Sequence, residues 1–126
     1  MKIMVLGVRG REHALAWRID QSPHLSGLWV ARGNAGTAEI ATNLNIHEEN
    51  DLEGIAAAAR SLGVDLVVVG SDKPLANGVV NVLQDAGVRA FGPTQEAAKI
   101  EWSKSFARDV SSAAGIPCPE YRVFFH

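Results

Sequence analysis

The chain has 126 residues, of which 47% are hydrophobic and 21% are charged, as in a single soluble globular domain. Its 12 basic and 14 acidic residues give a formal net charge of −2, and no segment reaches the ~18 apolar residues of a membrane span. We therefore expect neither nucleic acid nor a membrane as a partner. The single cysteine, Cys118, excludes an intramolecular disulfide and, with no signal-like opening, favours a cytoplasmic location.

Strands and helices are predicted to alternate along the first half of the chain. The glycine at position 7 ends the first apolar run, and Asn50 followed by Glu53 is typical of a capping box at a helix start. Gly63 supplies the helix stop. In chain order, the predicted elements are a strand over residues 2–6, a helix over 11–21, a strand over 28–31, a short strand over 44–46 and a helix over 51–62.

The second half continues this alternation. A continuous Leu-Val-Val-Val run favours a central strand that is covered on both faces. The predicted elements are a strand over residues 65–69, a helix over 77–86, a strand over 89–91, two short helices that meet near Ser103 and end at Gly115, and a strand over 121–125. This pattern predicts an α/β fold: a Rossmann-like parallel sheet flanked by helices, with right-handed crossovers.

Ligands of such sheets bind beyond the carboxyl ends of the strands, where the strand order reverses. The loops at Gly7, Arg32, Gly70 and Gly92 follow strands and are therefore the candidate ligand loops. The first loop, Gly7-Val8-Arg9-Gly10-Arg11, would let an anion approach the amides of the following helix. Its spacing is close to the dinucleotide fingerprint, but Arg9 stands where the second glycine should be.

Positive charge follows several of the predicted strands. Four cations, Arg9, Arg11, Arg32 and Lys73, should lie near one edge of the sheet and favour a phosphorylated ligand. They could equally be solvated surface side chains. Asp72 could neutralise Lys73 or accept hydrogen bonds from a ribose. The histidines show no metal-ligand spacing, and the three tryptophans fit core or interface positions better than a stacking platform.

Several motifs follow the strands in a fixed order. They are Gly10-Arg11-Glu12-His13-Ala14-Leu15-Ala16-Trp17, Gly33-Asn34-Ala35-Gly36-Thr37, Val69-Gly70 with Pro74-Leu75, Phe91-Gly92-Pro93-Thr94, and Ala97-Ala98 leading to Glu101 and Ser103-Lys104. Read together, they resemble the N-terminal part of phosphoribosylamine-glycine ligase, also called glycinamide ribonucleotide synthetase. The resemblance spans the whole chain.

The resemblance implies a preATP-grasp domain over residues 1–115, with residues 116–126 starting the connection to the ATP-grasp region. The whole enzyme would join 5-phosphoribosylamine to glycine in de novo purine biosynthesis. It would use ATP with Mg²⁺ or Mn²⁺ to activate the glycine carboxylate as an acyl phosphate. The present chain would be a piece of that enzyme, without the C-terminal ATP-grasp domains, without a cofactor or catalytic residue of its own, and inactive alone.

The resemblance also implies the site residues. Substrate contacts are expected at Gly7, Gly10, Arg11, Glu12, His13, Gly33, Asn34, Gly36, Thr37, Asp72, Pro74, Gly92, Pro93 and Thr94. Lys104 would reach the nucleotide once the remaining domains are present. The chain departs from the family where it has Val8-Arg9 for asparagine-glycine, Arg32 for proline, Ser71-Asp72 for proline-glutamate, and Trp102 for a small residue.

Three other interpretations remain open from the sequence. Arg32 lies about 20 residues after the glycine turn, where an arginine can receive the 2′-phosphate of NADP in an oxidoreductase. Other ATP-grasp ligases and carboxylases carry a similar first domain. A module that binds no small ligand is the third.

Overall fold

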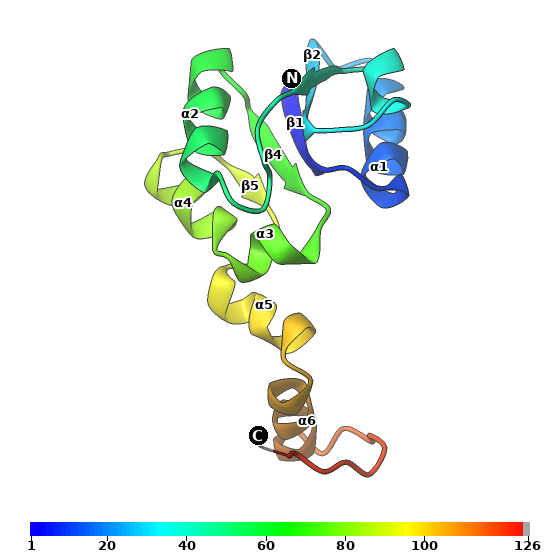
Figure 1. The fold of residues 1–126 in the computed structure, drawn as a ribbon, viewed down its shortest axis with the longest axis vertical. Helices are drawn as coiled ribbons and strands as arrows, with labels where there is room; N and C mark the ends of the chain where they lie inside the picture. The colour runs from blue at the N-terminus through cyan, green and yellow to red at the C-terminus, as the bar shows by residue number, and fades with distance from the viewer. Residues whose placement is uncertain (125–126) are drawn as a thin grey trace.

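A computed structural model describes residues 1–124 and contains one sheet of five parallel strands in the order β3-β2-β1-β4-β5 (Figure 1). The strands are β1 (Lys2–Gly7), β2 (Gly27–Arg32), β3 (Thr42–Leu44), β4 (Leu66–Val69) and β5 (Ala90–Phe91). The chain runs outward from β1 to β3, then returns to the other side of β1 for β4 and β5. The strand order therefore reverses between β1 and β4, which is the expected ligand position of such a sheet.

Helices cover both faces of the sheet, so the predicted α/β fold is confirmed. They are α1 (Gly10–Asp20), the 3₁₀ turn η1 (Thr37–Glu39), α2 (Leu52–Leu62), α3 (Asp72–Ala76), α4 (Val79–Asp85), α5 (Gln95–Trp102) and α6 (Lys104–Ala113). Figure 1 shows α1 on one side of the strands and α2 with α4 on the other. None of the helices described is long and apolar enough to cross a membrane.

The alternation of strand side chains divides the core into two layers. Met4 and Leu6 of β1 pack with Val67 of β4 toward α2 and α4, while Val5 and Val68 face α1. The side chains of Met4, Val5, Leu6 and Val67 are fully buried. Burial on both faces explains why the apolar runs of β1 and β4 could be identified from sequence as central strands.

Helix α2 begins one residue later than the capping pattern indicates. The Asp51 side chain, not Asn50, accepts a hydrogen bond from the Gly54 amide at 3.0 Å. Asn50 donates its backbone amide to the His47 carbonyl and belongs to the preceding turn. The predicted Asn50 capping box is therefore wrong, although the helix end at Gly63 is confirmed by its left-handed backbone, with a φ of 65°.

Other elements also differ from the sequence predictions: η1 was not predicted, and α4 begins at Val79 where a helix was expected from residue 77. Strand β3 pairs with β2 over residues 42–44, earlier than the predicted 44–46. Helix α3 was not predicted, because it has only five residues and contains Pro74, which argues against a helix. The helix tolerates Pro74 because the amides of a first turn need no intrahelical partner. Residues 121–124 form no strand, and Phe125 lies outside the described residues.

The last two helices leave the sheet, as the lower part of Figure 1 shows. They meet at Ser103, as predicted, where the Ser103 side chain accepts from the Phe106 amide and begins α6. Helix α6 has no buried residue. Its contacts are with α5, where the Lys99 ammonium lies 4.6 Å from the Phe106 ring centre, and with Tyr121, which donates to Asp109 at 2.9 Å.

Candidate functional site

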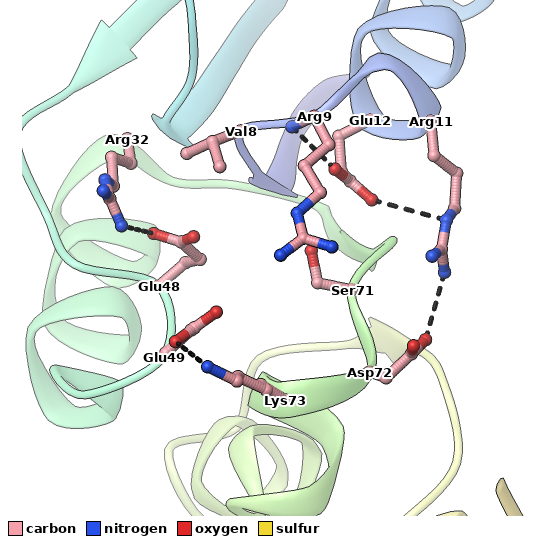
Figure 2. Close-up of a pocket in the computed structure, with 10 residues that line it drawn as sticks. All are labelled: Val8, Arg9, Arg11, Glu12, Arg32, Glu48, Glu49, Ser71, Asp72 and Lys73. Atoms are coloured by element: carbon pink, nitrogen blue, oxygen red, sulfur yellow. Dashed lines mark hydrogen bonds and ion pairs between the residues drawn. The ribbon is translucent and has the colours of Figure 1, made fainter. Parts of the chain in front are cut away.

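A polar pocket of about 340 Å³ lies at the point where the strand order reverses (Figure 2). Its walls come from the carboxyl ends of β1, β2 and β4 and from the loop after β3. The lining residues are Val8, Arg9, Arg11, Glu12, Arg32, Glu48, Glu49, Ser71, Asp72 and Lys73. The four cations expected to share one edge of the sheet therefore surround one cavity.

Four carboxylates accompany these cations, and three of the cations are paired with them. Nitrogen and oxygen are 3.0 Å apart between Arg11 and Asp72, 3.2 Å apart between Lys73 and Glu49, and 3.6 Å apart between Arg32 and Glu48. The hydrogen bond to Asp72 raises the pKa of the Arg11 guanidinium above its ordinary value. Asp72 thus pairs with Arg11, across the pocket, and not with its neighbour Lys73.

Arg9 is the exception among the cations. Its guanidinium forms no hydrogen bond or ion pair with residues 1–124, and Figure 2 shows it extending toward the middle of the pocket. Arg9 is the residue that precedes α1, so its charge adds to the positive end of the helix dipole. Gly10 follows with open space around it, since an added Cβ would meet no atom within 4 Å. An anion can therefore approach this helix end closely.

Glu12 is positioned beneath the pocket by two glycines. Its carboxylate accepts the Arg9 backbone amide at 2.9 Å, and its side chain is only 1% exposed. A Cβ on Gly7 would lie 2.2 Å from the Glu12 Cγ, and one on Gly70 would lie 2.8 Å from it. The glycines at the ends of β1 and β4 therefore make room for a carboxylate that fixes the first turn of α1.

The motif after β2 closes on itself through hydrogen bonds. The Asn34 side chain donates to the Val8 carbonyl at 2.9 Å and accepts from the Thr37 amide at 3.0 Å. Thr37 is fully buried, and its hydroxyl lies 2.8 Å from the Asn43 side-chain oxygen. A Cβ on Gly33 would collide with the Asn43 side chain. Asn34, Thr37 and Gly33 thus hold this loop against Val8 and do not line the pocket.

His13 and Gly36 pack against each other outside the pocket lining. A Cβ on Gly36 would lie 2.3 Å from His13 Cε1, so the glycine gives the imidazole its space. Neither residue lines the pocket, although both are in motifs expected to contact substrate. Their contact joins the first turn of α1 to the loop after β2.

The Gly92-Pro93-Thr94 motif borders a neighbouring groove of about 290 Å³ that shares Asp72 with the polar pocket. Pro93 lines this groove, the Thr94 side chain accepts from the Ala97 amide at the start of α5, and Pro74 is buried within α3. Trp102 also lines the groove and is 51% exposed. Lys104 is exposed at the start of α6 and lines neither cavity.

Two pocket residues, Glu48 and Glu49, were not identified from the sequence. Glu48 is 2% exposed, and its Oε2 has no hydrogen-bond partner within residues 1–124. Both follow β3, and the rule that located the other loops at the carboxyl ends of parallel strands would have found them had it been applied to the loop after this strand as well. Arg32, the residue considered for a 2′-phosphate, is engaged with Glu48 and with His47, whose Nε2 lies 3.2 Å away.

Over residues 1–124, no three His, Cys, Asp or Glu side chains are placed to hold a metal ion. The acidic residues of the pocket are instead interleaved with cations. The arrangement is suited to a ligand that carries an anionic group at one end and hydrogen-bond donors at the other.

Comparisons with known proteins agree with one another. The family model described as phosphoribosylglycinamide synthetase, N domain, matches residues 1–101. The chain is 50% identical over 124 residues to a phosphoribosylamine-glycine ligase of Xanthomonas campestris pv. campestris. The matched region covers 98% of this chain and 29% of that protein. Less than a third of that relative's length is therefore represented, and it is the N-terminal part.

Solved structures show the same fold. The crystal structure of phosphoribosylamine-glycine ligase from Thermotoga maritima superposes with a TM-score of 0.65 at 26% identity, over 91% of this chain and 25% of that one. The biotin carboxylase subunit of pyruvate carboxylase superposes with a TM-score of 0.68 at 16% identity, over 92% of this chain and 28% of that one, and shows the fold alone. Since the family model and the sequence relatives agree, the chain belongs to the phosphoribosylglycinamide synthetase N-domain family.

Proposed function

We propose that the polar pocket binds the phosphoribosyl group of 5-phosphoribosylamine, as the N-terminal domain of a ligase that joins this amine to glycine with ATP hydrolysis in de novo purine biosynthesis. The observation that carries the proposal is the meeting of Arg9, Arg11, Arg32 and Lys73 around one cavity at the N-terminus of α1. Helix amides and cations together favour a phosphate.

In this proposal the phosphate lies beside Gly10, where the backbone is accessible, and Arg9 closes over it. Arg11 borders the same space but is held by Asp72, so the two can act together as a fixed pair. A well-formed contact to a charged partner contributes roughly 1.5–3 kcal/mol. The remaining motif residues, among them Asn34 and Thr37, would act indirectly by fixing the pocket wall.

We place the chemical step outside this domain. ATP with Mg²⁺ or Mn²⁺, and the glycine that it activates, would be held by ATP-grasp domains that follow in the whole enzyme, in the cytoplasm. The share of the relatives that this chain covers, 29% of the Xanthomonas protein, supports that division. Lys104, exposed beyond the sheet, would then face the nucleotide. This chain alone should bind substrate without ligating it.

Arg9→Gln tests the phosphate site. Because this variant removes the one pocket cation without a carboxylate partner in residues 1–124, we expect it to bind ribose 5-phosphate about tenfold more weakly in calorimetric titration. Arg18→Gln is the matched control, since Arg18 is exposed in the last turn of the same helix, outside the pocket lining, and donates a hydrogen bond to Gln21. Equal affinity of the Arg9 variant and the parent chain would refute the phosphate site.

A further inference from the structure

The buried carboxylate of Glu48 is not satisfied by its ion pair with Arg32. Its side chain is 2% exposed, and its buried Oε2 accepts no hydrogen bond from residues 1–124. The nearest cation, Arg32, is 3.6 Å from Oε2, which is too long for a hydrogen bond. Buried carboxylates are normally satisfied by donors, because an unsatisfied one is costly to desolvate.

The two oxygens of the Glu48 carboxylate face different neighbours. Oε2, the buried oxygen without a hydrogen bond, lies 3.6 Å from Arg32, and Figure 2 shows the other oxygen turned toward the middle of the pocket, on the side opposite α1, where a ligand can reach it. Arg32 keeps the carboxylate in place although its own backbone is strained, with a φ of 66° in a region that residues other than glycine rarely adopt. Strain of this kind accumulates at ligand sites.

We infer that Glu48 accepts a hydrogen bond from the sugar end of the ligand, from a hydroxyl or an amine, and so distinguishes a phosphorylated ribose from a bare phosphate. The inference rests on the proposed function and adds an orientation to it. The phosphate lies at Arg9 and the start of α1, and the donors of the sugar lie at Glu48.

The charges around Glu48 favour a neutral donor over a metal ion. Arg32 lies 3.6 Å from Glu48, and the neighbouring Glu49 is paired with Lys73 at 3.2 Å, so two cations already occupy this end of the pocket. A further cation would be repelled by both. A hydroxyl or amine adds a donor without adding a charge that must be desolvated, which suits a carboxylate that is already buried.

The test compares two probes, ribose 5-phosphate and inorganic phosphate, by calorimetric titration of the full 126-residue chain. The parent chain should bind ribose 5-phosphate about 10- to 100-fold more tightly than phosphate, the range expected for hydrogen bonds to a charged group. In Glu48→Gln this preference should largely disappear while affinity for inorganic phosphate is kept or improved, because a negative charge has been removed. Glu53→Gln, which changes an exposed carboxylate at the start of α2, should keep the full preference.

A second variant tests the position of the acceptor. Glu48→Asp keeps the charge but withdraws the acceptor by one methylene, so it too should lose the preference. An unchanged preference in both Glu48 variants would overturn the inference and leave the phosphate site standing. A parent chain that binds both probes equally would also overturn it, whereas a parent chain that binds neither would refute the proposed function itself.

Discussion

At the scale of single residues, the family motifs and the pocket lining overlap only in part, through Arg11 and Glu12. The residues that make the chain recognisable include Glu12, Asn34 and Thr37, and the structure uses all three to fix loops from within. The side chains that face the pocket also include Arg9 and Glu48, which belong to none of the recognised motifs. Sequence could not separate the two roles, because two of the partners of Asn34, Val8 and Asn43, lie 26 and 9 positions away in the chain.

The glycine at the end of β1 can be tested against a nearby glycine with opposite surroundings. Gly7→Ala should lower the free energy of unfolding by about 1–3 kcal/mol, because its φ is +139° and its Cβ would lie 2.2 Å from Glu12 Cγ. Gly10→Ala should cause no such loss, since its Cβ meets nothing and alanine favours a helix. Urea denaturation of both variants measures the difference, and equal stability would contradict the proposed packing of Glu12.

At the scale of elements, the most reliable predictors of helices and strands were apolar runs and the glycines at the ends of elements. They predicted β1, β2, β4 and the end of α2, because burial on both faces leaves a continuous apolar run and a left-handed helix end requires glycine. The incorrect predictions concern short segments and a strand at the edge of the sheet. Strand β3 lies at the edge of the sheet and has three residues, and α3 has five. The segment at Tyr121 has the sequence pattern of a strand but pairs with no strand within residues 1–124.

The two candidate caps of α2 make a direct test. Asp51→Ala should destabilise the chain by about 1 kcal/mol, because the Asp51 side chain accepts from the Gly54 amide at 3.0 Å. Asn50→Ala should have a much smaller effect, since no side-chain hydrogen bond of Asn50 reaches the first turn of α2. Thermal unfolding of the pair decides between them, and a larger loss for Asn50→Ala would restore the capping box that the sequence suggested.

At the scale of the whole molecule, the chain consists of a sheet with two packed faces and a helical arm that extends beyond it. The core residues lie between Met4 and Ala98, and α6 contributes none. The predicted domain boundary at residue 115 therefore stays a prediction, because the arm is structured up to Ala113 but does not share the core. Periodicity reveals a helix of this kind and cannot tell what it packs against.

Removing the arm tests this division. A chain that ends at Ser103 should lose less than about 1 kcal/mol of stability, comparable to the exposed contact between Lys99 and Phe106 that is removed with α6. Denaturant unfolding followed by far-ultraviolet circular dichroism would measure it. A loss of several kcal/mol would mean that α6 supports the sheet after all.

The balance of four cations and four carboxylates around the pocket has a consequence for encounter with ligands. Opposite charges spaced so closely cancel each other's field beyond a few ångströms, so the domain cannot steer a distant anion by long-range attraction. A phosphate is attracted only after diffusion has brought it within roughly the 10 Å screening length of ordinary salt solutions. Specificity then depends on the contacts made inside the pocket, and the association rate constant should depend little on ionic strength.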